Sequence, residues 1–187
     1  MSSSSGIGVP GHRAPGVGFE APFEMLNACH ERVERMLDLI CKLRTHLHEH
    51  GWDVQASQAA TDVMRYFDVA APQHHLDEEM HVFPVLLALQ NITMDALICR
   101  LKQDHLEMES LWQFVKKTLD RVVNSNAQTW VPLSHNEQAV FDAFVSLYTE
   151  HLRHEELEVY PLAQPALSPQ QLDAMSRDMM RRRGQPV

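Results

Sequence analysis

The chain has 187 residues and a mass of 21.4 kDa, and 44% of its residues are hydrophobic, so a single domain with a substantial core accommodates it. Its 16 basic and 25 acidic residues give a net charge of -9, which disfavours nucleic acid as a partner and makes a cation easier to bind. Three cysteines without a C-x-x-C pair favour a reducing compartment, and no apolar stretch suits a signal peptide or a membrane span, so we expect a cytoplasmic protein of undetermined oligomeric state.

Four long amphipathic helices are expected along the chain. They follow residues 1–18, which are rich in Gly, Ser and Pro and are typical of a flexible lead. Gly51 ends the first helical stretch, and Ser134 with Glu137 has the spacing of a capping box that starts the fourth. By the recurrence of apolar residues, the four stretches cover about residues 24–50, 57–89, 94–123 and 134–161.

A shorter helix is expected after the fourth. Ser168 followed by Pro169 is typical of an N-cap and the first residue of a helix, which then runs to about residue 183. Long helices joined by short loops form an up-down-up-down bundle. We therefore predict an all-α fold, a four-helix bundle with a short C-terminal fifth helix. The expected organisation is a lead at residues 1–18, the bundle at residues 19–163, and the C-terminal helix and tail at residues 164–187.

One motif occurs twice in the chain. The pattern H-x-x-x-E-E-x-x-V-(F/Y)-P is present at residues 74–84, the first motif, and at residues 151–161, the second motif, which indicates an internal duplication. Residues four apart share a helix face, so the histidine and first glutamate of each motif lie side by side. Such pairs also occur on solvated surfaces, but a surface pair needs no repeated Val-aromatic-Pro. We interpret each pair as two metal ligands, with the second glutamates, Glu79 and Glu156, turned outward.

The two motifs are expected to lie at one level of the bundle. In antiparallel helices, residues equidistant from a turn share a height, because each residue rises about 1.5 Å. This counting places the first motif level with His30 and the second level with His105. Glu78 and His105 are also similarly distant from the turn between them. The sequence thus predicts one buried site with the ligands His30, His74, Glu78, His105, His151 and Glu155.

The composition of this site indicates a pair of metal ions. Four imidazoles and two carboxylates are costly to bury unless a cation binds them. Six ligands exceed the four of a tetrahedral zinc site, whereas two octahedral ions that share two bridging carboxylates use all six. Imidazole and carboxylate donors without thiolate favour iron, with manganese or zinc as alternatives. We therefore predict two iron ions, as Fe2+ or Fe3+, with open coordination positions.

These residues resemble the hemerythrin-like, or HHE cation-binding, domain family over about residues 20–163. The matching residues in order are His30, the H-x-x-x-E pair His74 and Glu78, His105, and the H-x-x-x-E pair His151 and Glu155. The resemblance implies a four-helix bundle around an oxo- or hydroxo-bridged di-iron site. It also implies that the ligand or substrate is a small molecule: dioxygen, nitric oxide or peroxide.

The chain departs from the oxygen-carrying members of this family at two places. Those proteins have a second histidine four residues after the ligand on the third helix, where this chain has Glu109, and H-x-x-x-x-D on the fourth, where this chain has H-x-x-x-E. It is more similar to the branch with iron-sulfur repair proteins, whose N-terminal module has neighbouring cysteines that residues 1–18 lack. We expect a protein that binds or senses the small molecule. The alternatives are an enzyme that detoxifies peroxide or nitric oxide, and an iron-centre repair or iron-delivery module.

Four other residues are candidates for additional or outer roles at the site. Glu109 follows the ligand on the third helix by one turn, as a seventh ligand or an outer hydrogen-bond acceptor. His81 and Glu158 occupy the same place in the two motifs and are expected to bind each other or to orient ligands. Tyr148 precedes the second motif and lines the site or packs in the core. The remaining motif histidines, His75 and His154, are expected to be exposed.

Overall fold

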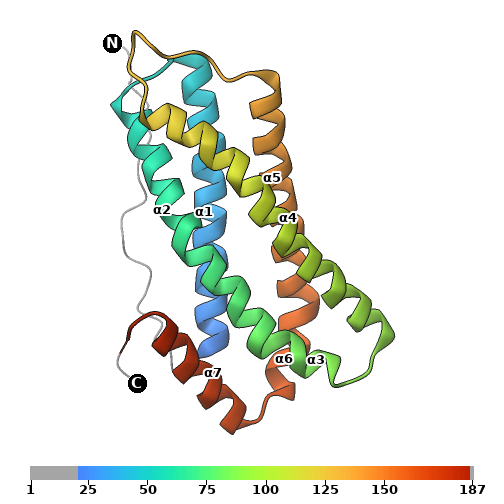
Figure 1. Cartoon of the computed structure of the whole chain (residues 1–187). Helices are drawn as coiled ribbons and strands as arrows, with labels where there is room; N and C mark the ends of the chain where they lie inside the picture. Colours follow the sequence, from blue (N-terminus) through green and yellow to red (C-terminus); the bar gives the residue numbers. More distant parts are fainter. Residues whose placement is uncertain (1–20, 186–187) are drawn as a thin grey trace, which may run out of the picture.

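The computed structural model describes residues 21–185, which are almost entirely helical and contain no strand. Four long helices form a bundle, and a shorter helix lies across one end of it (Figure 1). The all-α bundle with a C-terminal helix is therefore confirmed, whereas the predicted lead at residues 1–18 lies outside the described residues. Within the described residues, no helix has both the length and the apolar composition needed to cross a membrane.

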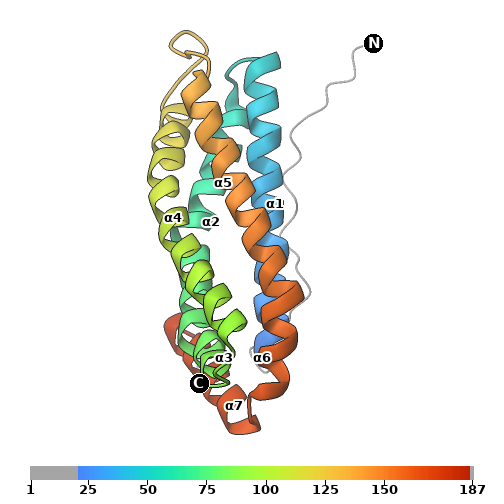
Figure 2. The same ribbon diagram turned by 90° about the vertical axis from the view of Figure 1, so that its right-hand side faces the viewer.

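Two of the four long helices continue beyond a widened turn. The first two are α1 (Pro22–Glu49) and α2 (Val54–Asp77), and α2 continues through η1 (Glu78–Val82) into α3 (Phe83–Leu87). The other two are α4 (Ile92–Val123) and α5 (His135–His154), and α5 continues through η2 (Glu155–Val159) into α6 (Tyr160–Ala166). The C-terminal helix is α7 (Pro169–Arg182). Figure 2 shows the long helices nearly parallel to one axis, with α7 at the end where α3 and α6 lie.

The helix boundaries follow the capping residues in the sequence. Ser134 and Glu137 form the expected capping box of α5, and Ser168 caps α7, with Pro169 as its first residue. Asp53 caps α2 by accepting a hydrogen bond from the backbone of Ala56. These local signals explain why periodicity and caps alone located the five helical segments.

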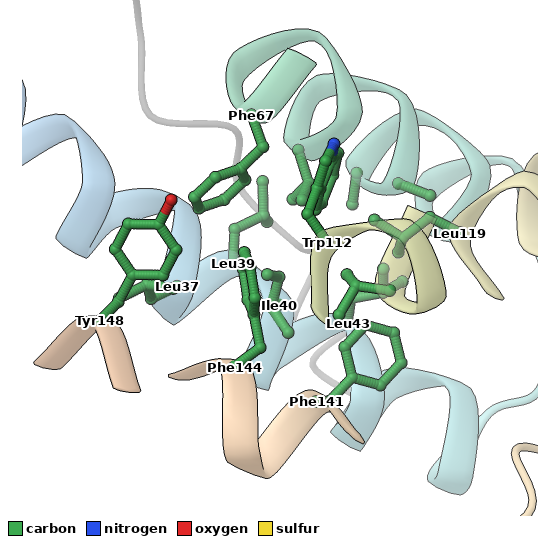
Figure 3. Packing of buried hydrophobic residues seen from close by; sticks show 14 of the residues in the cluster. Leu37, Leu39, Ile40, Leu43, Phe67, Trp112, Leu119, Phe141, Phe144 and Tyr148 are labelled. Atoms are coloured by element: carbon green, nitrogen blue, oxygen red, sulfur yellow. The ribbon is translucent and has the colours of Figure 1, made fainter. Parts of the chain in front are cut away.

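The core consists of two hydrophobic clusters at different levels of the bundle. The larger lies toward the loop between α4 and α5 and contains the aromatic group of Phe67, Trp112, Phe144 and Tyr148 (Figure 3). The smaller lies toward α7 and includes Phe23, Leu26, Leu101 and Val159, with Met175 and Met179 of α7. On α1, Leu26 belongs to one cluster and Val33 to the other, with buried His30 between them. A polar layer therefore separates the two clusters.

Each repeated motif contains one π turn. The backbone N–H of Phe83 donates to the carbonyl of Glu78, five residues earlier, and Tyr160 donates to Glu155 in the same way. Proline follows each aromatic residue and lacks an N–H, so the ordinary helical hydrogen bond is lost at that place. The wider turn accommodates the proline and rotates the aromatic ring of each motif relative to a regular α-helix. Such turns are frequent at functional sites.

Helix α7 is fixed to α2 by a buried carboxylate. The side chain of Asp77 is fully buried and pairs with Arg182 and, at 2.6 Å, with Arg183. His81 of η1 lies 2.9 Å from Asp178 of α7, and Asp178 also pairs with Arg182. Burial would raise the pKa of Asp178, but the hydrogen bonds from His81 and Arg182 outweigh it and lower the pKa. These contacts place α7 against the chain that carries the first motif.

Candidate metal centre

The six predicted ligands meet in the polar layer between the two hydrophobic clusters. All six are buried, with exposed fractions of 5% or less. They come from four helices and the two π turns: His30 (α1), His74 (α2), Glu78 (η1), His105 (α4), His151 (α5) and Glu155 (η2). Counting residues from the turns thus located one layer in the bundle, although the side chains are separated widely in the sequence.

The ligand atoms form two overlapping groups. We call one group metal position 1, which contains His30, His74, Glu78 and Glu155. We call the other metal position 2, which contains His105 and His151 with the same Glu78 and Glu155. Within each group the four potential ligand atoms lie within 4.8 Å of one another. Each position therefore has two imidazoles of its own and shares both carboxylates.

The two carboxylates each direct one oxygen to each position. Glu78 Oε1 lies 3.4 Å from His74 Nε2, whereas its Oε2 lies 3.6 Å from His105 Nε2. Glu155 Oε2 lies 3.2 Å from His30 Nε2, whereas its Oε1 lies 3.0 Å from His151 Nε2. Both carboxylates could therefore bridge a pair of bound cations.

The unsatisfied polar atoms of the layer fit bound metal ions. Both ring nitrogens of His74, Glu78 Oε2 and both oxygens of Glu155 are buried and make no hydrogen bond within the described part of the chain. Buried polar groups are normally paired, because leaving one unpaired costs several kcal/mol (roughly 2–7). Two cations would supply the missing partners of His74 Nε2, Glu78 Oε2 and both Glu155 oxygens, because these four atoms lie beside other potential ligand atoms. The donor set is imidazole and carboxylate, which suits iron, manganese and zinc.

Protonated histidines balance the carboxylates in the metal-free protein. Burial lowers the pKa of His30 and His151, but Glu155 and Glu78 outweigh it and raise the pKa of each to about 10. Burial raises the pKa of Glu78, but His74, His105 and His30 outweigh it and hold the pKa well below the ordinary value. The layer therefore favours positive charge between its two carboxylates, which protons or metal ions supply.

The second glutamate of each motif contacts a predicted ligand on another helix. The sequence did not predict these contacts. Glu156 Oε1 lies 3.0 Å from His30 Nδ1, and Glu79 Oε1 lies 2.8 Å from His105 Nδ1. Their side chains are 44% and 34% exposed, so the expectation that they turn outward holds only in part. Histidines that bind metal usually donate their other N–H to such a partner. The doubled glutamate in both motifs was the signal for this role.

His151 has a similar partner on the neighbouring helix. Its Nδ1 lies 3.3 Å from Asp104 Oδ2 on α4. Asp104 immediately precedes the predicted ligand His105, so one turn of α4 contributes both a ligand and an outer acceptor. Three of the four histidines thus have a carboxylate on the ring nitrogen that faces away from the ligand groups.

The aromatic residues of the two motifs stack on histidines of the layer. The ring of Tyr160 lies 5.1 Å from that of His30 with an interplanar angle of 24°. The ring of Phe83 lies 5.8 Å from that of His105 with an interplanar angle of 20°. The two halves of the site are therefore similar, except that one aromatic residue carries a hydroxyl group. Sequence reasoning used these residues only as markers of the repeat.

Two of the secondary candidates have partners other than those expected. His81 pairs with Asp178 of α7, and Glu158 lies 2.6 Å from His154, so the predicted contact between His81 and Glu158 is wrong. His154 is partly buried by this contact rather than exposed. Glu109 is exposed and belongs to neither metal position, which places it outside the ligand set. His81, Glu158 and Glu109 thus belong to neither group of potential ligand atoms.

A pocket of about 360 Å3 lies between α2 and α4 and reaches the layer. His105, one of the predicted ligands, lines it together with Glu79, Glu109 and Tyr148. His75, which was expected to be exposed, is half-buried here and stacks on His105 with ring centres 4.0 Å apart. Burial lowers the pKa of His75 well below its ordinary value, and the neighbouring His105 lowers it further, so the ring is neutral. The pocket therefore leads to metal position 2 along a neutral imidazole.

Comparison with known proteins agrees with this geometry. A family model described as the hemerythrin HHE cation binding domain matches residues 21–163. The chain is also 28% identical over 162 residues to an uncharacterized protein of Haemophilus influenzae (strain ATCC 51907 / DSM 11121 / KW20 / Rd). That alignment covers 87% of this chain and 90% of the relative.

Proposed function

This chain belongs to the hemerythrin HHE cation-binding domain family, and from that premise we propose that its buried layer holds two iron ions and binds dioxygen, nitric oxide or peroxide. The observation that carries the proposal is the sharing of Glu78 and Glu155, because each directs one oxygen to each metal position. Bound iron would supply Lewis acidity and one-electron redox chemistry at this place.

The number and type of donors favour iron or manganese over zinc. Each position offers two imidazole nitrogens and two carboxylate oxygens, with no thiolate. An octahedral ion held by four such donors keeps free corners, whereas a tetrahedral zinc ion would have none. A site that binds a small molecule requires at least one free corner. The donor set therefore supports iron or manganese with room for an external ligand.

The pocket between α2 and α4 supports access for a small molecule rather than a large one. It is lined by His105 and Glu79, and its other walls are side chains of α2, α4 and α5. A volume of about 360 Å3 is near the lower end of ordinary ligand pockets, and the ring of His75, which stacks on His105, also lines this pocket. Dioxygen, nitric oxide and peroxide are small enough to pass. Phe67, Met108, Trp112 and Tyr148 of the larger hydrophobic cluster form part of the pocket wall.

A reducing location fits the three cysteines of the chain. Cys29 is buried, Cys41 and Cys99 are exposed, and none of them is in a disulfide. Exposed thiols persist where the cell keeps them reduced. We therefore place the proposed function in the cytoplasm, where cell fractionation would test it.

Optical titration of the iron-loaded protein tests the proposal. Anaerobic ferrous protein should show a saturable change in its visible spectrum when nitric oxide, dioxygen or peroxide is added. The variant Leu106→Trp, at the exposed wall of the pocket, should slow this change without altering the iron content, because Leu106 is 61% exposed and belongs to neither ligand group. A protein that binds two iron ions but responds to none of the three molecules would overturn the proposal.

A further inference from the structure

The hydroxyl of Tyr160 lies beside metal position 1, and the sequence predicted no role for this residue at the site. Its side chain is buried, and its hydroxyl oxygen lies 2.9 Å from His30 Nε2. The hydroxyl also donates a hydrogen bond to Glu78 Oε1. Building on the proposed function, we propose that Tyr160 is a fifth protein ligand of metal position 1, bound through its phenolic oxygen.

The spacing of the oxygen matches that of a ligand. Donor atoms about 2.0–2.2 Å from an octahedral ion lie about 3 Å apart when they occupy adjacent corners. The phenolic oxygen is 2.9 Å from His30 Nε2, and the other proposed ligand atoms of this position are similarly spaced, with Glu155 Oε2 at 3.2 Å from the same nitrogen. His74 Nε2 and Glu78 Oε1 are 3.4 Å apart. The oxygen of Tyr160 therefore lies where a neighbouring corner of the coordination sphere would be.

The chemistry of the hydroxyl leads to the same conclusion. Its two partners are His30 Nε2 and Glu78 Oε1, and both atoms belong to the ligand group. A cation bound to these two atoms would occupy the lone pairs with which they bind the Tyr160 hydroxyl. The buried hydroxyl would then lack a hydrogen-bond partner, which costs free energy. Binding the ion directly restores the interaction. The O–H bond then breaks, an iron–oxygen bond forms, the proton is released to water, and the oxidation state of the iron is unchanged.

Comparison of the two motifs shows that this ligand exists on one side only. The equivalent of Tyr160 in the first motif is Phe83, which stacks on His105 as Tyr160 stacks on His30. Metal position 2 therefore has four protein ligands and metal position 1 has five. The more open position is also the one that the pocket reaches through His105. A single hydroxyl group in a duplicated motif thus makes the two ions unequal and directs the external ligand to position 2.

Resonance Raman spectroscopy of the ferric protein tests this ligand directly. Phenolate bound to iron(III) gives a visible charge-transfer band, and excitation in that band enhances the ring vibrations of the bound tyrosine. Wild-type protein should show this band. Tyr160→Phe should lose it while keeping two iron ions per chain. Tyr66→Phe is the matched control and should keep it, because the Tyr66 hydroxyl donates to the backbone of Cys29, outside the layer.

Each outcome of this experiment decides the inference. Wild-type protein with two iron ions and no tyrosine vibrations, or a band that persists in Tyr160→Phe, would overturn the assignment of Tyr160 alone. Fewer than two iron ions in wild-type protein would overturn the proposed function instead. If Tyr160→Phe fails to fold, wild-type protein labelled with ring-deuterated tyrosine replaces it. Its enhanced vibrations should shift, and unshifted vibrations would refute tyrosine ligation.

Discussion

Removal of the outer carboxylates Glu79 and Glu156 should weaken the two metal positions separately. Loss of such a partner typically costs 10–100-fold in metal affinity, or about 1.4–2.7 kcal/mol. Both side chains are partly exposed, so water can replace part of the lost hydrogen bond, and we expect about tenfold for each alanine variant. Glu79→Ala should have the larger effect, because its contact with His105 is shorter, at 2.8 Å against 3.0 Å to His30, and less exposed.

A competition titration with a chelator, resolved into two binding steps, measures these losses. Glu156→Ala should weaken the step that belongs to metal position 1, and Glu79→Ala the step that belongs to metal position 2. Glu158→Ala is the matched control, because Glu158 also binds a histidine and is 49% exposed, but His154 lies outside the layer. Equal losses in all three variants, or no loss in the first two, would refute the assignment of Glu79 and Glu156 to their histidines.

Three further predictions concern stability. Replacing Arg182 and Arg183 together with alanine leaves the buried Asp77 carboxylate unpaired and should cost about 3 kcal/mol or more, lowering Tm by roughly 6–12 °C in thermal unfolding; an unchanged Tm would contradict the role of this contact. Metal-free protein should lose stability as pH rises from about 6.5 toward 10. The pKa values of His30 and His151 are raised to about 10 in the folded protein, so their protonation stabilises the fold fully only below the pKa of a histidine in the unfolded chain, about 6.5. Metal-loaded protein should instead lose metal and stability as pH falls through roughly 6 to 5, since its imidazoles must be neutral to bind. Tm measured across pH with and without chelator checks both, and slopes of the same sign would contradict the account.

The helices and the six predicted ligands followed from the sequence because both depend on regular geometry. Helical periodicity and capping residues located the segments, and the constant rise per residue related positions on antiparallel helices. His30 and His105 were found in this way, although neither lies in the repeated motif. A straight bundle preserves such levels over its whole length, so counting from the turns remains accurate.

Counting levels along the helices did not predict the roles of several residues. These residues either follow a turn that departs from regular α-helical geometry or have partners that depend on how the helices pack against one another. The π turn after Glu155 brings Tyr160 over the site, whereas a regular helix would place it on another face. Glu79 and Glu156 cross to histidines of other helices, so their role depends on the rotation of each helix about its axis. The partner of His81 is Asp178 of α7, and no periodicity in the sequence indicates where a fifth helix docks.

We propose that one layer of the bundle binds two metal ions through shared carboxylates. Metal analysis of purified, iron-loaded protein against protein concentration tests it most directly, with Glu155→Ala as the comparison. We predict two iron ions per chain in the wild type. Because Glu155 directs an oxygen to both positions, its removal should weaken the binding of both ions. One iron ion or none in the folded wild-type chain would contradict the account.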